Sequence, residues 1–394
     1  MVEDIKGENF SGMVAVILCL IGRKNEIIFV GIQNKNSAKI CNFITRSDDE
    51  DYLKSKRYLY NNMLNKVLII AELGMTHNGS VSLAKKLINS AVDCGVDAVK
   101  FQMHIFDEES LPDAPSPKYF TNESRKEFFK RTSFTEEQWI GIKKHIKDKR
   151  KKFVCSPFSI KAVKSLEKIG VDIYKIPSGE VTNTPYLEIV AKTKKPIILS
   201  TGMNNWKELD SAVKTINKYN KNLFIMQCTS SYPCKYEEVG LNVIKEMQAR
   251  YKMPVGLSDH TLTIYASFAA VTLGAKIIEK HFTTHKNLYG PDAKFSLEPN
   301  EMKNLVEGIR NIEIMLNNKV DKDDIIKFKD MKFIFEKSIV SKKYIKKGTV
   351  ITSDLLDFKK PGDGIRADRM KEIIGKKVKV DIPGNTMVLL EHVK

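Results

Sequence analysis

The sequence predicts an α/β fold in which a (β/α)8 TIM barrel is followed by a small β-rich domain. From residue 67 onward, eight short β-branched apolar runs alternate with amphipathic segments of helical period. Eight such units over about 250 residues have the size of this barrel, whereas a doubly wound open sheet more often has fewer strands. After residue 336, short strand-like runs separated by Gly turns indicate the small domain.

The apolar runs give the bounds of the expected barrel strands. We expect strands at 67–73, 98–103, 151–158, 173–179, 196–202, 223–229, 255–260 and 275–282. Between them, apolar residues three and four apart predict helices, for example at 82–95, 161–170, 204–220 and 300–318. The connection from 104 to 150 is long and polar, so we expect an inserted loop over the barrel mouth there.

The chain of 394 residues exceeds the usual size of one domain, and we divide it into four parts. These are an N-terminal extension of unassigned role at 1–62, the barrel at 63–318, a charged linker at 319–336 and the β-rich domain at 337–394. Met63 directly precedes the first barrel strand, so the extension is either an appendage or the result of a start codon placed too far upstream.

Composition argues against several classes of protein. The net charge is +17, but the lysines are spread along the chain among acidic residues, so we expect no dedicated nucleic-acid surface. The apolar stretch 13–22 is about half the length needed to cross a bilayer, and we expect no membrane partner. The six cysteines form no C-x-x-C pair, which suits a reducing compartment, and we place the protein in the cytoplasm.

Polar side chains end nearly every predicted strand, where the loops of such a barrel converge on one mouth. They are Glu72, Lys100, Gln102, Ser156, Lys175, Ser178, Ser200, Thr201, Gln227, Thr229, Asp259, His260, Glu279 and His281. A single Lys or His at such a place is most often structural. Together, however, the two lysines and the short hydroxyls suit a phosphate, and the glycines of PSGE and STGM let backbone N–H groups approach the same anion.

The histidines raise the question of a metal. His260 and His281 end neighbouring strands beside Glu72 and Glu279, so two imidazoles and two carboxylates could face one cavity. A divalent cation is then reasonable, although neither an H-E-x-x-H motif nor a Cys cluster marks the site.

Nine segments along the barrel resemble the sialic acid synthase family, which condenses phosphoenolpyruvate with an amino sugar. They are IIAELGMTHNGS, DAVKFQ, CSPF, YKIPSGE, PIILSTGM, QCTSSYPC, GLSDHT, LGAKIIEKHFT and GPDAKFSLEP, in family order. In the tail, KKGTVITSDLLDFKKPGDGI is similar to the antifreeze-like (SAF) domain that ends these synthases. The resemblance covers all but the first 62 or so residues.

The resemblance implies roles for particular residues. The set matching phosphoenolpyruvate binding is Lys100, Ser156, Lys175, Ser178 and Ser200. It implies that Glu72 is essential to turnover, that Gln102 and Asp259 contact the sugar, and that His260 binds a divalent cation, Mn²⁺ or Mg²⁺. The implied catalytic residues are Glu72, Lys175 and His260. The expected reaction joins phosphoenolpyruvate to an N-acetylmannosamine-type aldehyde and releases phosphate by C–O cleavage.

Two positions depart from one bacterial branch of the family. Gln227 stands where that branch has a second metal-binding His, and we expect it to be a weaker metal ligand. Lys360 stands where that branch has an Arg that reaches into the partner subunit's site, and Arg366 six residues later is an alternative. Either residue acting in this way implies a domain-swapped homodimer.

The sequence leaves three other functions open. Within the family, the acceptor can be a 2,4-diacetamido hexose, as in legionaminic or pseudaminic acid synthesis. A Schiff-base pyruvate aldolase would use Lys175 as its nucleophile and need no metal. A carbohydrate or ice-binding protein would use only the C-terminal domain. Against this last reading, Glu72, Lys100, Lys175 and His260 are all present at strand ends.

Overall fold

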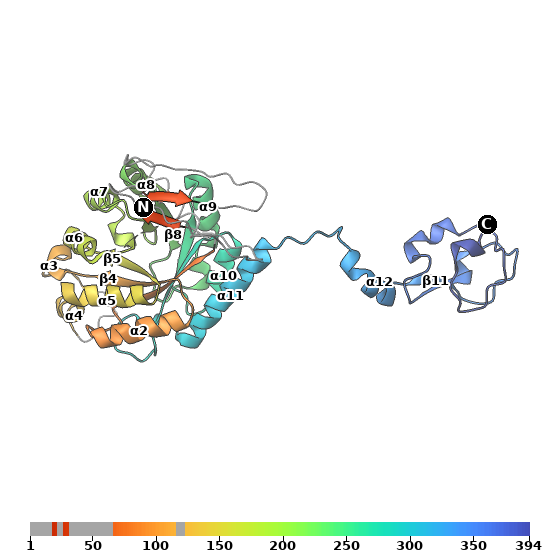
Figure 1. Ribbon diagram of the computed structural model, residues 1–394, viewed down its shortest axis with the longest axis horizontal. Coiled ribbons are helices and arrows are strands. Elements are labelled where there is room, and N and C mark those ends of the chain that lie inside the picture. Colours follow the sequence, from red (N-terminus) through yellow and green to blue (C-terminus); the bar gives the residue numbers. More distant parts are fainter. Residues whose placement is uncertain (1–17, 22–26, 31–65, 116–122) are drawn as a thin grey trace, which may run out of the picture. The chain divides into compact units, whose positions relative to one another are not determined.

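A computed structural model of the protein describes residues 18–21, 27–30, 66–115 and 123–394 (Figure 1). The chain divides into two compact units between Asn317 and Asn318. Most of the expected extension at 1–62 lies outside the described residues. Its described part is an antiparallel pair of strands, β1 (Leu18–Ile21) and β2 (Ile27–Val30).

The first unit contains the predicted barrel. Eight parallel strands close in the order β10-β3-β4-β5-β6-β7-β8-β9, which confirms the predicted fold class (Figure 1). They are β3 (Leu68–Gly74), β4 (Ala98–Met103), β5 (Lys152–Pro157), β6 (Ile173–Ile176), β7 (Ile197–Ser200), β8 (Leu223–Cys228), β9 (Val255–Asp259) and β10 (Ile277–His281). Closure between β10 and β3 leaves no exposed strand edge.

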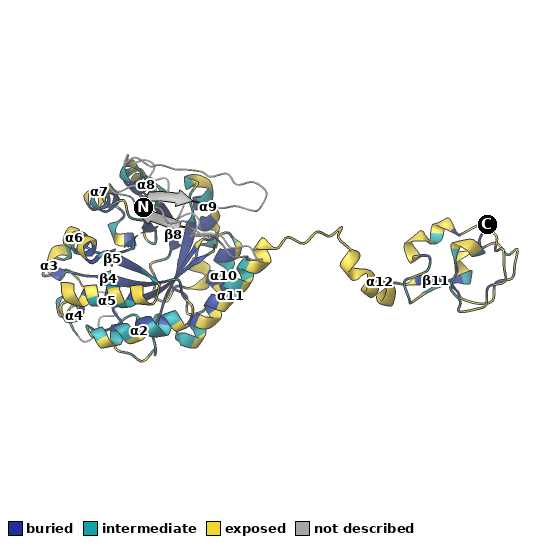
Figure 2. Ribbon diagram, viewed as in Figure 1, coloured by how far each residue is buried: buried dark blue, intermediate teal, exposed yellow. Residues whose placement is uncertain are grey.

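Helices surround the barrel and turn their apolar faces toward it (Figure 2). They are α2 (Val81–Asp93), α5 (Glu136–Asp148), α6 (Ile160–Ile169), α7 (Thr184–Lys192), α8 (Trp206–Tyr219), α9 (Leu241–Tyr251), α10 (Tyr265–Thr272) and α11 (Pro299–Asn317). Side-chain oxygens of Ser80, Ser159 and Asn205 cap the starts of α2, α6 and α8. Short 3-10 turns at Ser178–Glu180, Tyr236–Glu238 and Ala293–Phe295 lie in the loops.

The connection 104–150, expected to be an inserted loop, contains three helices in its described residues, 104–115 and 123–150. Besides α5 they are α3 (Phe106–Glu109) and α4 (Arg125–Thr132). Ser124 and Thr135 begin α4 and α5 with reciprocal side-chain and backbone hydrogen bonds. The two capping boxes in this polar stretch therefore explain why the prediction of a loop was wrong for much of the segment.

Strand alternation decides which side chains face the barrel interior, because successive residues of a strand point to opposite faces. An apolar layer fills the interior: Leu68, Ile70, Ala98, Val154, Ile173, Ile198, Phe224, Met226 and Ile277. Two residues further along the strands, the same alternation places Glu72, Lys100, Ser156, Lys175, Ser200, Cys228 and Glu279 at the carboxyl end. The functional residues thus stand on a packed apolar floor.

The second unit has its own core, formed by ten buried aliphatic residues that include Ile339, Ile351 and Val388. It contains α12 (Lys329–Phe335) and an antiparallel pair of strands, β11 (Ser338–Ser341) and β12 (Leu356–Lys359). Helix α12 lies inside the segment expected to be a linker. In the part of the chain that the structure describes, no helix is long and apolar enough to cross a membrane.

Candidate active site

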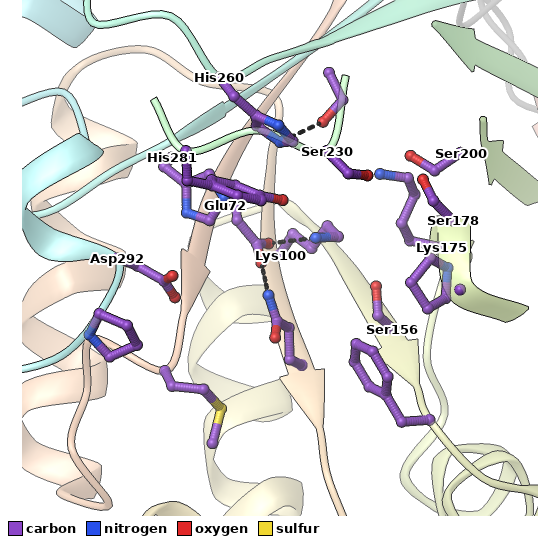
Figure 3. Close-up of a pocket in the computed structure, with 18 of the residues that line it drawn as sticks. Glu72, Lys100, Ser156, Lys175, Ser178, Ser200, Ser230, His260, His281 and Asp292 are labelled. Atoms are coloured by element: carbon purple, nitrogen blue, oxygen red, sulfur yellow. Dashed lines mark hydrogen bonds and ion pairs between the residues drawn. The ribbon is translucent and has the colours of Figure 1, made fainter. Parts of the chain in front are cut away.

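A cavity of about 430 Å³ opens at the carboxyl ends of the strands (Figure 3). The sequence-predicted residues that line it are Glu72, Lys100, Gln102, Ser156, Lys175, Ser178, Ser200, His260, Glu279 and His281. Figure 3 shows His260, His281 and Asp292 on one side and Lys175, Ser178 and Ser200 on the other. Glu72 and Lys100 lie between the two groups. The structure therefore brings residues from seven strands or strand ends into one site.

The two lysines form a buried network with two carboxylates. Lys175 Nζ lies 2.9 and 3.0 Å from the carboxylate oxygens of Glu279. Lys100 Nζ lies 2.7 Å from Glu72 Oε2 and 3.4 Å from Glu279 Oε1. Burial lowers the pKa of Lys100, but Glu279 and Glu72 raise it further, so its net pKa lies above the usual range. The ammonium group is therefore held in its charged form.

The pKa of Glu279 is shifted in the opposite direction to that of Lys100. Burial raises the pKa of its carboxyl, but Lys100 and Lys175 lower it by more, so the net pKa lies well below the usual range. Ser258 Oγ also donates to Glu279 Oε1 at 3.2 Å. The charges of the two lysines are thus balanced inside the protein, and a bound anion would have to compete with Glu279 for them.

Short hydroxyl side chains lie near Lys175. Ser178 and Ser200 lie beside it, and Ser156 lies on the same side of the cavity (Figure 3). Ser178 Oγ accepts from the backbone N–H of Gly202 at 2.8 Å. A Cβ at Gly202 would lie 2.4 Å from Ser230 Oγ and 3.0 Å from Ser178 Oγ, so only glycine lets these hydroxyls approach the backbone so closely. Together with Lys175 they can supply charge and hydroxyl donors to a phosphate.

His260 and His281 form an imidazole pair, with ring centroids 5.7 Å apart. The Tyr232 ring lies 4.2 Å from that of His260 and packs edge-on against His281. His260 Nδ1 lies 2.8 Å from the carbonyl oxygen of Thr229, which can only accept, so Nδ1 carries the hydrogen. In neutral His260, Nε2 is therefore the nitrogen with a lone pair.

The environment of His281 also suits metal binding. Burial, with smaller contributions from His260 and Lys100, lowers the pKa of His281 to about 4, although Asp292 opposes this. Its buried Nδ1 finds no hydrogen-bond partner among the described residues. Within those residues, no three His, Cys, Asp or Glu side chains form a ready metal cage. Burial lowers the pKa of His260, but Cys228 and the Thr229 carbonyl raise it by more, so its net pKa lies above the usual range. The imidazole of His281 and, when deprotonated, that of His260 nevertheless fit a divalent cation beside Asp292, with its other positions filled by water or substrate.

The structure contradicts two of the predicted assignments. Gln227 lies on the outer face of β8, where its amide donates to the carbonyl oxygen of Val239 at 3.0 Å. Its neighbour Cys228 faces the cavity instead. Gln227 is therefore not placed to bind a metal in the cavity, because side chains alternate along the strand.

Asp259 is also turned away from the cavity. It accepts from the backbone N–H of Thr261 at 2.9 Å and from Ser267 Oγ at 2.7 Å. It also forms a buried ion pair with Lys280 at 3.1 Å. Asp259 therefore does not contact a sugar in the cavity, and instead fixes the loop that carries His260.

Several cavity residues were not predicted from the sequence. They are His104, Arg125, Phe158, Cys228, Tyr232, Ser258 and Asp292. The inward positions of Cys228 and Ser258 follow from strand alternation and could have been predicted. Asp292 comes from a loop, and its carboxylate would lie 2.6 Å from a Cβ placed on Gly74, which shows how closely that loop approaches β3.

Lys360 and Arg366 belong to the second unit, and both are exposed. Lys360 Nζ lies 4.8 Å from the centroid of the Phe335 ring. Arg366 pairs with Asp368 at 2.8 Å. Their expected role in a partner subunit's site stays a prediction.

Comparison with known proteins gives the family. The model of the NeuB family matches residues 87–321, which is more than half of the chain. The chain belongs to the NeuB family. A SAF domain follows in this NeuB-family protein at residues 336–394. Both matches confirm the resemblance to sialic acid synthases with a C-terminal SAF domain.

Relatives of this NeuB-family chain carry names of amino-sugar acid synthases. The N,N'-diacetyllegionaminic acid synthase of Campylobacter jejuni is 40% identical over 321 residues, covering 79% of this chain and 96% of that protein. The N-acetylneuraminate-9-phosphate synthase of Homo sapiens is 32% identical over 332 residues, covering 82% and 92%. The crystal structure of N-acetylneuraminic acid (sialic acid) synthetase from Leptospira borgpetersenii is 31% identical, with a TM-score of 0.60, covering 68% and 92%.

Family membership makes the chain an enzyme of phosphoenolpyruvate-dependent condensation, of the sialic acid synthase type. The paired lysines and the serines near Lys175 are consistent with such a substrate.

Proposed function

We propose that the protein condenses phosphoenolpyruvate with an open-chain N-acetylmannosamine-type aldehyde to give a nine-carbon 2-keto sugar acid and phosphate. The observation that carries this proposal is the arrangement of one cavity. Lys175 and three serines occupy one part, the imidazoles of His260 and His281 occupy the other, and Lys100 lies between them (Figure 3). An anionic phosphoenol donor and a polar aldehyde acceptor would be bound side by side.

The two lysines and the serines bind the donor. Lys175 and Lys100 provide positive charge for the phosphate, and Ser178 and Ser200 provide hydroxyl donors beside Lys175. When phosphoenolpyruvate binds, its phosphate takes over part of the interaction that Glu279 makes with both lysines. The same charges then stabilise phosphate as it leaves.

The reaction makes one carbon–carbon bond and breaks one carbon–oxygen bond. C3 of phosphoenolpyruvate attacks the aldehyde carbon, and the aldehyde oxygen takes up a proton. Water then adds at C2, and the C2–O bond to phosphate breaks, leaving the 2-keto acid. Glu72, fixed by Lys100 and Gln102, is the carboxylate that we place beside the reacting carbons. Its negative charge can stabilise the cationic centre that develops at C2.

We further propose that His260 and His281 hold the divalent cation, Mn²⁺ or Mg²⁺. When bound, the cation supplies Lewis-acid polarisation of the aldehyde. Among the described residues, Nδ1 of His281 has no hydrogen-bond partner, and Nε2 of His260 offers a lone pair once that imidazole is deprotonated. Both observations support this pair as the protein ligands. In the sequence-based expectation, Gln227 held the place that we now give to His281.

A second acceptor class is supported by a specific observation. The Campylobacter jejuni relative named as a diacetyllegionaminic acid synthase is 40% identical to this chain. We therefore keep 2,4-diacetamido hexoses as alternative acceptors, because the donor half of the cavity would serve them equally. A Schiff-base aldolase fits less well, since Lys175 Nζ is bound by both carboxylate oxygens of Glu279 and is not free to attack a carbonyl.

The test is phosphate release from phosphoenolpyruvate with three aldehydes. These are N-acetylmannosamine, its 2,4-diacetamido-6-deoxy analogue and the altrose-configured pseudaminic precursor. We expect release with N-acetylmannosamine and little or none without an aldehyde. Release with only a diacetamido sugar would replace the proposed acceptor. Borohydride trapping of pyruvate on the enzyme, with no phosphate release, would replace the proposed reaction by that of an aldolase.

We also propose a domain-swapped homodimer in which Lys360 or Arg366 completes the sugar site of the partner. The resemblance to the family and the exposure of both side chains support this proposal. Mixing Lys360→Ala with Lys175→Ala tests it, because a mixed dimer would contain one site free of both substitutions. Recovery of activity on mixing is expected, and a monomer at assay concentration would contradict the proposal.

A further inference from the structure

His104 directly follows β4 and lies in the middle of a hydrogen-bonded chain that runs from α3 to the cavity. Its ring is stacked between the rings of Phe129 and Phe158, with both centroid distances 3.9 Å. Its side chain is 6% exposed. This stacking fixes the plane of the imidazole, so each ring nitrogen faces one defined partner.

The chain has four members. His104 Nδ1 lies 2.8 Å from Glu109 Oε1, and His104 Nε2 lies 3.1 Å from Gln102 Oε1. Gln102 Nε2 in turn donates to Glu72 Oε1 at 2.7 Å. A carboxylate from α3 is thereby linked, through two side chains, to the carboxylate that we place beside the reacting carbons.

The positions of the hydrogens in this chain can be assigned by starting from Glu72. Glu72 is paired with Lys100 at 2.7 Å, so its carboxylate only accepts hydrogen bonds. Gln102 must therefore present its NH₂ group to Glu72 and its carbonyl oxygen to His104. Because that oxygen also only accepts, Nε2 of His104 must carry a hydrogen.

The other end of the chain requires a second hydrogen. If Glu109 is a carboxylate, it only accepts, and Nδ1 of His104 must then be protonated as well. If Nδ1 carries no hydrogen, Glu109 must be protonated and donate to it. In both cases the His104–Glu109 pair holds one proton more than a neutral imidazole beside a carboxylate.

We propose that His104, charged with this shared proton by Glu109, is a positioning residue for Glu72. It holds the carbonyl oxygen of Gln102, and the amide of Gln102 can then only offer its NH₂ group to Glu72. Loss of the shared proton leaves one hydrogen bond of the chain without a donor. If Gln102 then turns over, its carbonyl oxygen meets the Glu72 carboxylate, which displaces Glu72 from its position. The inference rests on the proposed function of Glu72.

Other charged groups surround this chain. The Arg125 guanidinium of α4 lies 5.6 Å from the centroid of the same Phe129 ring. Lys100 lies beyond Glu72. The remaining charged side chains border cavities next to His104 or Glu109 and are Asp107, Asp113, Lys130, Glu136 and Glu180. Glu109 is the acidic side chain among them that is within hydrogen-bonding distance of the imidazole, so it is the residue to vary.

Three variants test the proposal through phosphate release. His104→Phe keeps an aromatic ring between Phe129 and Phe158 but removes both ring nitrogens. We expect kcat to fall by about 10- to 100-fold, the usual effect of losing an outer positioning group, with little change in KM for phosphoenolpyruvate. The kcat of Glu109→Ala should fall to the same extent. Glu109→Gln should stay close to wild type near neutral pH, because its amide can donate to Nδ1 while Nε2 keeps its hydrogen.

The matched control is His145→Phe in α5, a half-buried histidine outside the cavity whose Nε2 lies 2.9 Å from Asn89 Oδ1. It should leave kcat unchanged. A kcat that is kept in Glu109→Gln but lost in Glu109→Ala separates a hydrogen-bonding role of this position from a merely structural one.

A measurement independent of activity completes the test. Nitrogen-15 spectra of the His104 ring, assigned through its loss in His104→Phe, should show both nitrogens hydrogen-bonded with a shared proton in the wild type. In Glu109→Gln, only Nε2 should be protonated. An unprotonated Nε2 in the wild type, or a Glu109→Gln variant as slow as Glu109→Ala, would overturn the proposal. If the wild type releases no phosphate with any aldehyde, the proposed function fails, while the spectra still decide the state of His104.

Discussion

Lys175 and Glu279 form a buried ion pair across the barrel interior, with Nζ 2.9 and 3.0 Å from the two carboxylate oxygens. Both side chains are at most 5% exposed. Glu279 neutralises Lys175 in this buried site, but an incoming anion can replace its interaction with the ammonium group. The ion pair therefore keeps a positive charge available for an anion. The proposed donor site is therefore organised before an anion binds.

Removing the charge of Glu279 should reveal what its ion pair with Lys175 contributes to stability and to anion binding. In Glu279→Gln, Lys175 loses its carboxylate, and we expect the free energy of unfolding to fall by about 3 kcal/mol. Added phosphate should stabilise this variant more than the wild type, because the anion takes the place of the carboxylate. Denaturant unfolding with and without phosphate measures both effects. Equal stabilisation of the two proteins by phosphate would show that the anion does not bind at these lysines.

The lysine and the imidazoles should both be needed for turnover. We expect Lys175→Ala, His260→Ala and His281→Ala to lose phosphate release by at least about 100-fold while remaining folded. Mn²⁺ binding, followed by electron paramagnetic resonance, should be lost in the two histidine variants and kept in Lys175→Ala. Near wild-type turnover of His260→Ala with added manganese would refute the metal assignment.

Gln227 provides the matched comparison for the histidines. Because its amide bonds to the carbonyl oxygen of Val239 outside the cavity, Gln227→Ala should bind Mn²⁺ as the wild type does. It should lose only about 1 kcal/mol of stability, the value of one buried hydrogen bond. A large loss of Mn²⁺ affinity would restore Gln227 as a ligand.

Asp259 should matter for stability rather than for sugar affinity. In Asp259→Asn, Lys280 keeps a buried charge without its partner, so we expect a loss of about 3 kcal/mol in the free energy of unfolding. The double variant Asp259→Asn with Lys280→Met should recover most of that loss. A stable Asp259→Asn protein with a strongly raised KM for the sugar is the opposite result.

His77 should make the protein less stable in acid. Burial, and secondarily Arg131, lowers the pKa of His77 from 6.5 to about 3. Above pH 6.5, His77 is neutral in both states and contributes nothing; as the pH falls from there toward 3, only the unfolded chain takes up the proton. Stability should therefore fall through this window, by up to about 1.4 kcal/mol per pH unit from this residue.

The control for this pH dependence is His77→Asn. The amide oxygen of asparagine can still accept from the Gly79 N–H, as His77 Nδ1 does at 3.1 Å, but it does not titrate. Urea unfolding at several pH values should give a flatter slope for the variant than for the wild type. Equal slopes would mean that His77 does not supply the proton uptake.

Much of the fold and site could be predicted from the sequence, because parallel strands of a barrel are buried on both faces and read as apolar runs. A polar residue at the end of such a run must find a partner. On that basis Glu72, Lys100, Lys175 and His260 were correctly placed in one cavity. The helices of 104–150 were missed because their capping residues lie in a stretch whose polarity suggests a loop.

The two wrong site residues share one physical cause. Gln227 and Asp259 are each one position away from an inward residue, Cys228 and His260, and a shift of one residue moves a side chain to the opposite face. Counting by twos from Met226 of the apolar floor would have rejected Gln227, and Ser258, the inward neighbour in β9, would have rejected Asp259. Asp292 could not be found in this way, because it reaches the cavity from a loop whose path the sequence pattern does not define.

We expect phosphoenolpyruvate to react here by carbon–oxygen cleavage during condensation with an amino-sugar aldehyde. Phosphoenolpyruvate carrying oxygen-18 at the bridging position reveals which bond breaks when the released phosphate is analysed by mass. The label should leave with phosphate, and the keto oxygen of the nine-carbon product should come from water. Phosphate without the label, or label retained in the keto acid, would mean that the carbon–oxygen bond is not the one that breaks.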